Sequence, residues 1–137
     1  MSSVGPILAA HPRAGDTATL ARAVDATAAC VAACTACADA CLSEHKDQML
    51  ARCIRLNLDC ADLCAATTRV LTRNPSGPGD LARALLEACV IACVECADEC
   101  QKHGAHGMEH CRLCAETCRA CEKACRLVLE SMLVASP

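Results

Sequence analysis

The amino-acid sequence predicts an all-α fold, an antiparallel up-down-up-down four-helix bundle with a cysteine-lined core. Proline and glycine concentrate in three short segments, at the N-terminus, at residues 73–80 and at residues 103–107. The stretches between these segments read as long helices. The cysteines recur at steps of three and four residues, which is the spacing of one helix face. With 137 residues, the chain has the length of a single domain.

Helix-capping signals and the loop segments set the expected helix boundaries. Asp16 or Thr17 is expected to cap the first helix, Asp47 to begin the second and Asp80 to cap the third. Gly104 and Gly107 are expected to break the chain before the fourth. Short connections between helices of this length make neighbouring helices antiparallel. The four expected helices span about residues 16–44, 47–72, 80–102 and 108–134.

An internal repeat relates the two halves of the bundle. The segments Cys30–Cys41 and Cys89–Cys100 have the same cysteine spacing and share eight of twelve residues. This similarity indicates a duplicated helical hairpin and a pseudo-symmetric bundle. The bundle domain is expected to comprise residues 16–137. Residues 1–15 are expected to precede it as a short helix or a loose segment.

The cysteine rows place their side chains toward the bundle axis. Steps of four, three and four correspond to the a and d positions of a heptad, which face the partner helices. In the second helix, Leu50 and Asn57 stand where the fourth helix has Cys111 and Cys118. Thiolate sulfur is a ligand for soft metal ions. The sixteen candidate metal ligands are Cys30, Cys34, Cys37, Cys41, Cys53, Cys60, Cys64, Cys89, Cys93, Cys96, Cys100, Cys111, Cys114, Cys118, Cys121 and Cys125.

Beyond the cysteines, the same heptad phase continues with mainly aliphatic side chains. Antiparallel packing brings these residues to one end of the bundle and the thiols to the other. The sequence therefore predicts an apolar plug at one end and a thiol compartment at the opposite end. The plug residues are Leu20, Leu71, Leu86, Val128 and Met132, with the smaller Ala23, Thr27, Thr67 and Ala82.

Sixteen inward thiols exceed what a single metal site requires. The N-terminus lacks the pattern of a signal peptide, so we expect a cytoplasmic protein with reduced thiols rather than a disulfide scaffold. Structural zinc takes four tetrahedral ligands, and the loop-borne cysteine run of ferredoxins is missing. Continuous rows on straight helices favour Cu(I), bound as many ions at roughly one per cysteine, because each ion offsets one thiolate charge. A protein that binds zinc or another soft metal, or a metal chaperone, is the alternative.

Histidine and methionine side chains gather at the thiol end of the predicted bundle. His45 and Met49 lie at the first hairpin loop, and the remaining residues of this kind surround the second. Imidazole and thioether groups bind Cu(I), so we expect this end to be a mouth that admits copper. The simpler interpretation is that these are solvated loop residues. The candidate metal-binding residues of the mouth are His103, His106, Met108 and His110.

These motifs together resemble the copper storage protein family, specifically its cytosolic bacterial branch. The resemblance covers about residues 16–134 and rests on three patterns, CxxxCxxCxxxC in the first and third helices, CxxCxxxCxxCxxxC in the fourth, and the loop HGAHGMEHC. It implies a four-helix bundle that holds many Cu(I) ions, with the cysteines as ligands and the mouth residues assisting uptake. It also implies a homotetramer.

Composition argues against several other functions. Lys and Arg total 13 against 16 Asp and Glu, for a net charge of −3, and no basic stripe for nucleic acid appears. Charged residues interrupt each candidate for a membrane span of roughly 20 apolar residues. No nucleophile with an adjacent base is evident, so we expect a non-enzymatic role, with a cysteine-based redox enzyme as a weaker alternative. The expected partners are copper ions, supplied by low-molecular-weight thiols or a copper chaperone.

Overall fold

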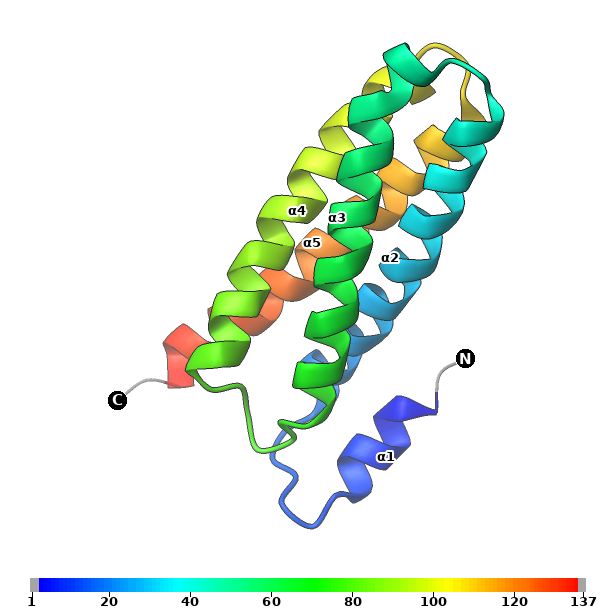
Figure 1. The fold of residues 1–137 in the computed structure, drawn as a ribbon. Coiled ribbons are helices and arrows are strands. Elements are labelled where there is room, and N and C mark those ends of the chain that lie inside the picture. The colour runs from blue at the N-terminus through cyan, green and yellow to red at the C-terminus, as the bar shows by residue number, and fades with distance from the viewer. Residues whose placement is uncertain (1–2, 136–137) are drawn as a thin grey trace.

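The computed structural model describes residues 3–135, and within them the chain forms helices and no strand (Figure 1). Helices α2–α5 form an antiparallel four-helix bundle, in which α2 and α4 each pack against both α3 and α5. The predicted all-α bundle is therefore confirmed. The helices are α1 (Val4–Ala10), α2 (Ala18–Ser43), α3 (Asp47–Thr72), α4 (Asp80–Gly104) and α5 (Glu109–Ala135).

The helix boundaries lie within two residues of those expected from the sequence. Helix α3 has the predicted bounds, and α4 continues to Gly104. Of the two expected caps of α2, Thr17 occupies the cap position, and the carboxylate of Asp16 accepts a hydrogen bond from the backbone N–H of Ala18 at 3.2 Å. At α4 the cap position belongs to Gly79, so the expectation that Asp80 caps this helix was wrong. Asp80 lies in the first turn, where its negative charge interacts favourably with the positive end of the helix dipole.

The α4–α5 hairpin contains a close approach of two helices. A Cβ atom at Gly104 would lie 2.9 Å from the Cα atom of Arg112, so only glycine permits this spacing. Gly104 is the last residue of α4 and does not break it, contrary to the sequence-based expectation. Gly107 does lie in the loop, with a φ of +95° that favours glycine. The sequence pattern does not show that α5 passes close to Gly104. It therefore assigned both glycines the same role as helix breakers.

The segment before the bundle contains the short helix α1. Of the two expected forms, a short helix or a loose segment, the structure shows the helix. Leu8 is buried, and a Cβ atom added at Gly5 would lie 3.9 Å from the Cβ atom of Ala21 on α2. Helix α1 lies near the end of the bundle where α2 begins (Figure 1). The division into residues 1–15 and 16–137 stays a prediction, and residues 136–137 lie outside the described range.

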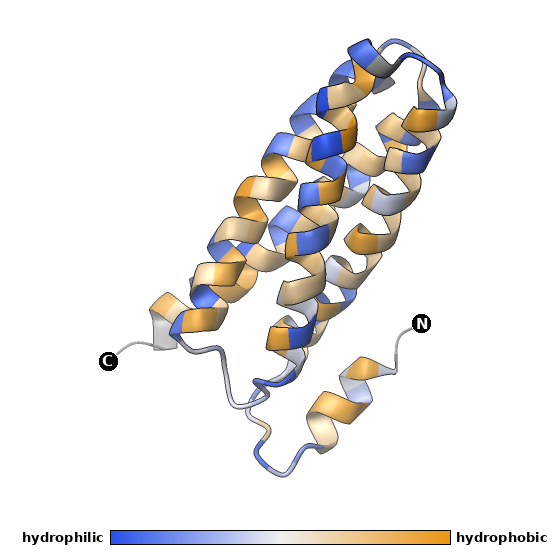
Figure 2. Ribbon diagram, viewed as in Figure 1, coloured by the Kyte–Doolittle hydropathy of each residue, from blue (hydrophilic) through white to orange (hydrophobic). Residues whose placement is uncertain are grey.

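The predicted apolar plug forms the end of the bundle opposite the two tight hairpin loops. Leu20, Leu71, Leu86 and Val128 are buried, and Met132 is partly buried. Each large aliphatic side chain buried in this way stabilises the fold by about 1.5–3 kcal/mol. Hydrophilic residues gather instead at the end formed by the α2–α3 and α4–α5 loops (Figure 2). The plug thus supplies ordinary core packing without any metal.

Helix α2 meets a length-and-hydropathy criterion for a membrane span, with a mean hydropathy of 1.5 over its best window. Arg22, Asp25 and Asp39 interrupt this helix, as expected from the sequence. The apolar character comes largely from alanine and cysteine. Since the cysteine face of α2 is buried against the other bundle helices, the helix has the packing of a core element.

Candidate metal centre

The thiol compartment occupies the bundle from its middle to the end with the short hairpin loops. Each of the sixteen cysteines is buried and free of disulfide bonds within the described residues. The prediction that all the thiols face the bundle interior is confirmed. The heptad spacing accounts for this placement, because every step of three or four residues returns to the same face of its helix.

The sulfur atoms lie in van der Waals contact with one another. Along α2, the Sγ atoms of Cys30 and Cys34 are 3.7 Å apart. Between helices, Cys64 and Cys89 approach to 3.5 Å. With metal–sulfur bonds of about 2.3 Å, as for zinc, the sulfurs of a tetrahedral site are separated by roughly 3.8 Å and those of a trigonal site by roughly 4.0 Å. The observed spacing therefore suits thiolate coordination of a metal ion with little movement of the helices.

The thiols form overlapping groups whose ligand atoms all lie within 4.8 Å of one another. Cys30, Cys34 and Cys118 each belong to two of these groups. Shared sulfurs are suited to bridging several ions in one cluster, whereas separate sites need separate ligands. Five of these groups are Cys30–Cys64–Cys93–Cys121, Cys30–Cys34–Cys60–Cys118, Cys34–Cys96–Cys114–Cys118, Cys37–Cys100–Cys114 and Cys37–Cys41–His110–Cys111.

Hydrogen bonds among the thiols and burial shift their pKa values in both directions; hydrogen bonds with Cys118, for example, lower the pKa of Cys30 and of Cys60. Burial has the opposite effect. It raises the pKa of Cys41, and the neighbouring Cys53 and Cys111 raise it further, because a second negative charge nearby is unfavourable. The pKa of Cys34 is raised as well, chiefly by its hydrogen bond with Cys114. Without metal, such thiols stay neutral at pH 7. Metal binding at these sulfurs must then release protons.

Asn57 is a buried polar side chain among the thiols. Its Oδ1 atom accepts hydrogen bonds from the Sγ–H groups of Cys96 at 3.0 Å and Cys114 at 3.2 Å. Its Nδ2 atom donates to the Sγ atom of Cys53 at 3.7 Å. The sequence showed only that Asn57 interrupts the row of α3. In the structure, the amide oxygen points into the thiol compartment and is one more atom there that could coordinate a metal ion.

At the mouth, the imidazole of His110 lies beside two thiols. Its Nδ1 atom lies 3.5 Å from the Sγ atoms of both Cys37 and Cys111. Its Nε2 atom lies 2.9 Å from the Oε2 atom of Glu44, at the end of α2. Sequence reasoning missed Glu44, because its partner is 66 residues away.

The other predicted mouth residues lie near this site but have different neighbours. The Nε2 atom of His103 is 2.9 Å from Glu99, and the Nδ1 atom of His106 is 2.7 Å from the backbone oxygen of Lys102. Met108 is buried and belongs to the core, whereas Met49 is exposed. Among the thiol groups given above, the mouth histidine that takes part is His110.

The mouth is also asymmetric between the two halves of the repeat. Leu50 occupies the place on α3 that corresponds to Cys111 on α5, and it is completely buried. The α2–α5 side of the mouth therefore presents thiols and an imidazole, while the α3 side presents an aliphatic side chain.

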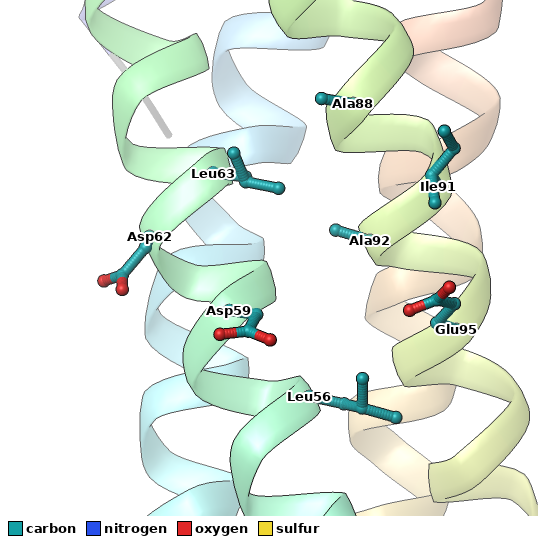
Figure 3. A pocket seen from close by; sticks show the side chains of 8 residues that line it. All are labelled: Leu56, Asp59, Asp62, Leu63, Ala88, Ile91, Ala92 and Glu95. Carbon is teal, nitrogen blue, oxygen red and sulfur yellow. The ribbon is translucent and has the colours of Figure 1, made fainter.

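The outer surface carries a groove lined by apolar and acidic side chains. A groove of about 460 Å³ lies between α3 and α4, lined by Leu56, Leu63 and Ile91 together with acidic residues such as Asp59 and Glu95 (Figure 3). No cysteine lines this groove. The interior thiols, rather than this groove, carry the soft-metal chemistry of the protein.

The fold and the site together define a class, namely helical-bundle proteins with a multinuclear thiolate core. Residues 16–130 match the family described as copper storage protein, Csp. The chain belongs to this family, as its cysteine rows predict. The match covers the whole thiol compartment.

Similar proteins of known structure agree with this assignment. The copper storage protein Ccsp from Streptomyces lividans, in a structure loaded with 10 copper equivalents, is 45% identical, with a TM-score of 0.87 over 93% of this chain and 98% of that one. The Cu(I)-bound copper storage protein BsCsp3 is 31% identical, with a TM-score of 0.67 over 77% of this chain and 93% of that one. An uncharacterized cysteine-rich protein of Bacillus subtilis strain 168, YhjQ, is 34% identical over 68% of this chain and 80% of its own length.

Proposed function

We propose that this protein stores and sequesters many Cu(I) ions inside its four-helix bundle, with the sixteen cysteines as thiolate ligands. The observation that carries the proposal is the overlap of the thiol groups, in which single sulfurs such as Cys30 and Cys118 belong to two groups. Bridging thiolates hold several copper ions per group of ligands. Membership of the copper storage family supports the same function.

Zinc is the alternative to be tested, because four thiols at this spacing also fit a tetrahedral ion. Each zinc ion needs four ligands of its own in a structural site. Groups that share Cys34 or Cys118 cannot all be filled in this way. The overlap therefore favours Cu(I), which takes two or three sulfur ligands and tolerates bridging.

An anaerobic titration of the reduced protein distinguishes these possibilities. Cu(I) is added from a chromophoric chelator, and bound metal and protein are measured after gel filtration, with zinc run in parallel. We expect well over ten Cu(I) per monomer, approaching one per cysteine, and far less zinc. A plateau at one to four copper ions contradicts storage and favours a zinc or chaperone site.

The mouth residues His103, His106, Met108 and His110 assist copper uptake in this proposal. Support is strongest for His110, whose Nδ1 atom faces two thiols. Copper then passes from the mouth to the deeper sulfurs, since Leu71 and Leu86 block the opposite end. The function is storage for detoxification or supply and needs no catalytic step.

The proposed location is the cytosol, where low-molecular-weight thiols or a copper chaperone deliver the metal. A similar structure from Streptomyces lividans is described as a cytosolic copper storage protein. We further propose a homotetramer. Exposed apolar side chains such as Ile91, Leu81 and Leu133 favour association. Native mass spectrometry measures the oligomeric state, and a monomer at micromolar concentration contradicts this part of the proposal.

A further inference from the structure

The imidazole of His110 bridges two hairpins of the bundle. Its ring nitrogens have different partners, two thiols on one side and the carboxylate of Glu44 on the other. Both side chains are partly shielded, with 27% of His110 and 35% of Glu44 exposed. The contact is therefore less weakened by solvent than a fully exposed ion pair.

The Glu44 contact selects one tautomer of the neutral imidazole. The Nε2–H group donates to the carboxylate of Glu44, so the lone pair of the ring is on Nδ1. That lone pair lies 3.5 Å from the Sγ atoms of Cys37 and Cys111, and it accepts a hydrogen bond from one S–H group of this pair in the absence of metal. When Cu(I) replaces these thiol protons, the protons leave to solvent and the lone pair is already directed at the ion. No oxidation or reduction is involved.

A second histidine–carboxylate pair at the mouth shows why this arrangement is particular to Glu44. His103 and Glu99 are also 2.9 Å apart, but they belong to the same helix. Glu99 also forms ion pairs with Arg52 at 3.5 Å and Lys102 at 3.6 Å, so its carboxylate is shared between His103 and two cations. The thiol groups given above do not include His103. Of these two contacts, the Glu44 contact holds the ring whose Nδ1 atom lies 3.5 Å from two thiol sulfurs.

We propose that Glu44 is a positioning residue for copper uptake, which holds His110 with its Nδ1 lone pair toward Cys37 and Cys111. The inference rests on the proposed function, since it concerns how the stored ion reaches the thiols. Carboxylates that orient a metal-binding histidine typically change metal affinity by about 10–100-fold. The effect is confined to the first ions bound at the mouth, because the deeper thiols do not contact Glu44.

The test compares the parent with Glu44→Gln and Glu44→Leu. Gln keeps the shape but has both a donor and an acceptor, so it permits either tautomer, while Leu removes the contact. Asp39→Asn is the control, because it removes one negative charge from the exposed surface of the same helix. Long-range proton–nitrogen NMR of the reduced apo-protein reports the tautomer of His110. Stopped-flow mixing with chelated Cu(I) reports the uptake rate, and metal analysis reports the final load.

We expect the parent and Asp39→Asn to carry the proton on Nε2, and the two Glu44 variants to lose this preference. Initial uptake should slow about tenfold or more in Glu44→Leu, and less in Glu44→Gln. The final load should be the same in all four proteins. Circular dichroism verifies that each variant is folded.

An unchanged tautomer and rate in folded Glu44→Leu overturns the positioning role while leaving storage intact. An equal slowing in Asp39→Asn also overturns it, because general surface charge then explains the rate. Failure of the parent itself to bind more than four copper ions refutes the storage function. The two failures are therefore distinguishable in one set of measurements.

Discussion

Leu50 on α3 and Cys111 on α5 occupy corresponding positions in the two halves of the repeat, and both are completely buried. The internal symmetry of the bundle is thus broken at the mouth by an aliphatic side chain in place of a thiol. This difference concentrates the soft ligands at the α2–α5 side, where His110 joins Cys37 and Cys41.

Replacing Leu50 by cysteine should extend the thiol row of α3 and raise the copper capacity by about one ion per monomer. The smaller side chain leaves a cavity, so we expect apo-protein stability to fall by roughly 1–3 kcal/mol. Chemical denaturation and Cu(I) titration measure the two effects. Leu50→Ala is the matched control, with a similar or greater loss of stability and no added ligand. Equal capacities in these two variants contradict the prediction.

The mouth histidines should contribute unequally to the rate of copper uptake. His110→Ala should slow loading markedly, because its Nδ1 atom faces two thiols. A His103→Ala, His106→Ala double variant should also slow loading, but to a smaller extent. The final load should change little in either case, since the deeper thiols remain. Stopped-flow loading decides: equal slowing in both variants indicates that the histidines act as a group, as the sequence alone predicted.

Gly104→Ala should destabilise the α4–α5 hairpin. The added Cβ atom meets backbone of Arg112 at 2.9 Å, so the two helices must separate. Overpacking of this kind costs about 1–3 kcal/mol. Gly15→Ala is the control, because its added Cβ meets only ordinary contacts at 3.9 Å or more. Thermal unfolding of both apo-proteins checks the difference, and equal melting temperatures contradict it.

The apolar plug should stabilise the apo-protein independently of copper. Leu86 is completely buried, and Leu86→Ala should reduce the free energy of unfolding by about 2–5 kcal/mol. Copper capacity of the folded variant should remain at the parent value, because no thiol is altered. Urea denaturation followed by metal analysis tests both statements. A large loss of copper at full folding shows instead that the plug shapes the thiol compartment.

The thiol pKa values predict opposite pH effects on the apo-protein and on copper binding. Burial raises the pKa of Cys41 above its ordinary value of 9.0, so the folded state keeps this thiol neutral at a pH where the unfolded chain ionises. The contribution of Cys41 to apo-protein stability is therefore fully present below about pH 9 and is lost as the pH rises further. Copper affinity should instead increase with pH, because each ion displaces about one proton.

Two measurements test this pair of effects. Thermal melting of the reduced apo-protein between pH 7 and pH 10.5 should show the loss of stability. Loading in weakly buffered solution with a pH indicator should show about one proton released per Cu(I). Loading without proton release contradicts neutral apo-thiols, and it indicates that the compartment holds thiolates before metal arrives.

The spacing of the cysteines was sufficient to predict the bundle and the direction of its thiols. Side chains three and four residues apart share a helix face wherever the helix lies, so the positions of Cys30 and Cys34 followed from local geometry alone. The apolar end followed from the same periodicity, since Leu20 and Leu86 continue the phase of the rows above them.

Only the tertiary structure decided which mouth residues act together. Whether Nδ1 of His110 faces Cys37, and whether Glu44 holds the other nitrogen, depends on how α2 and α5 are placed against each other. The close approach at Gly104 depends on the spacing of α4 and α5 in the same way. Helix periodicity fixes the face on which a side chain lies, whereas hydrogen bonds between distant helices depend on packing distances that the sequence pattern does not contain.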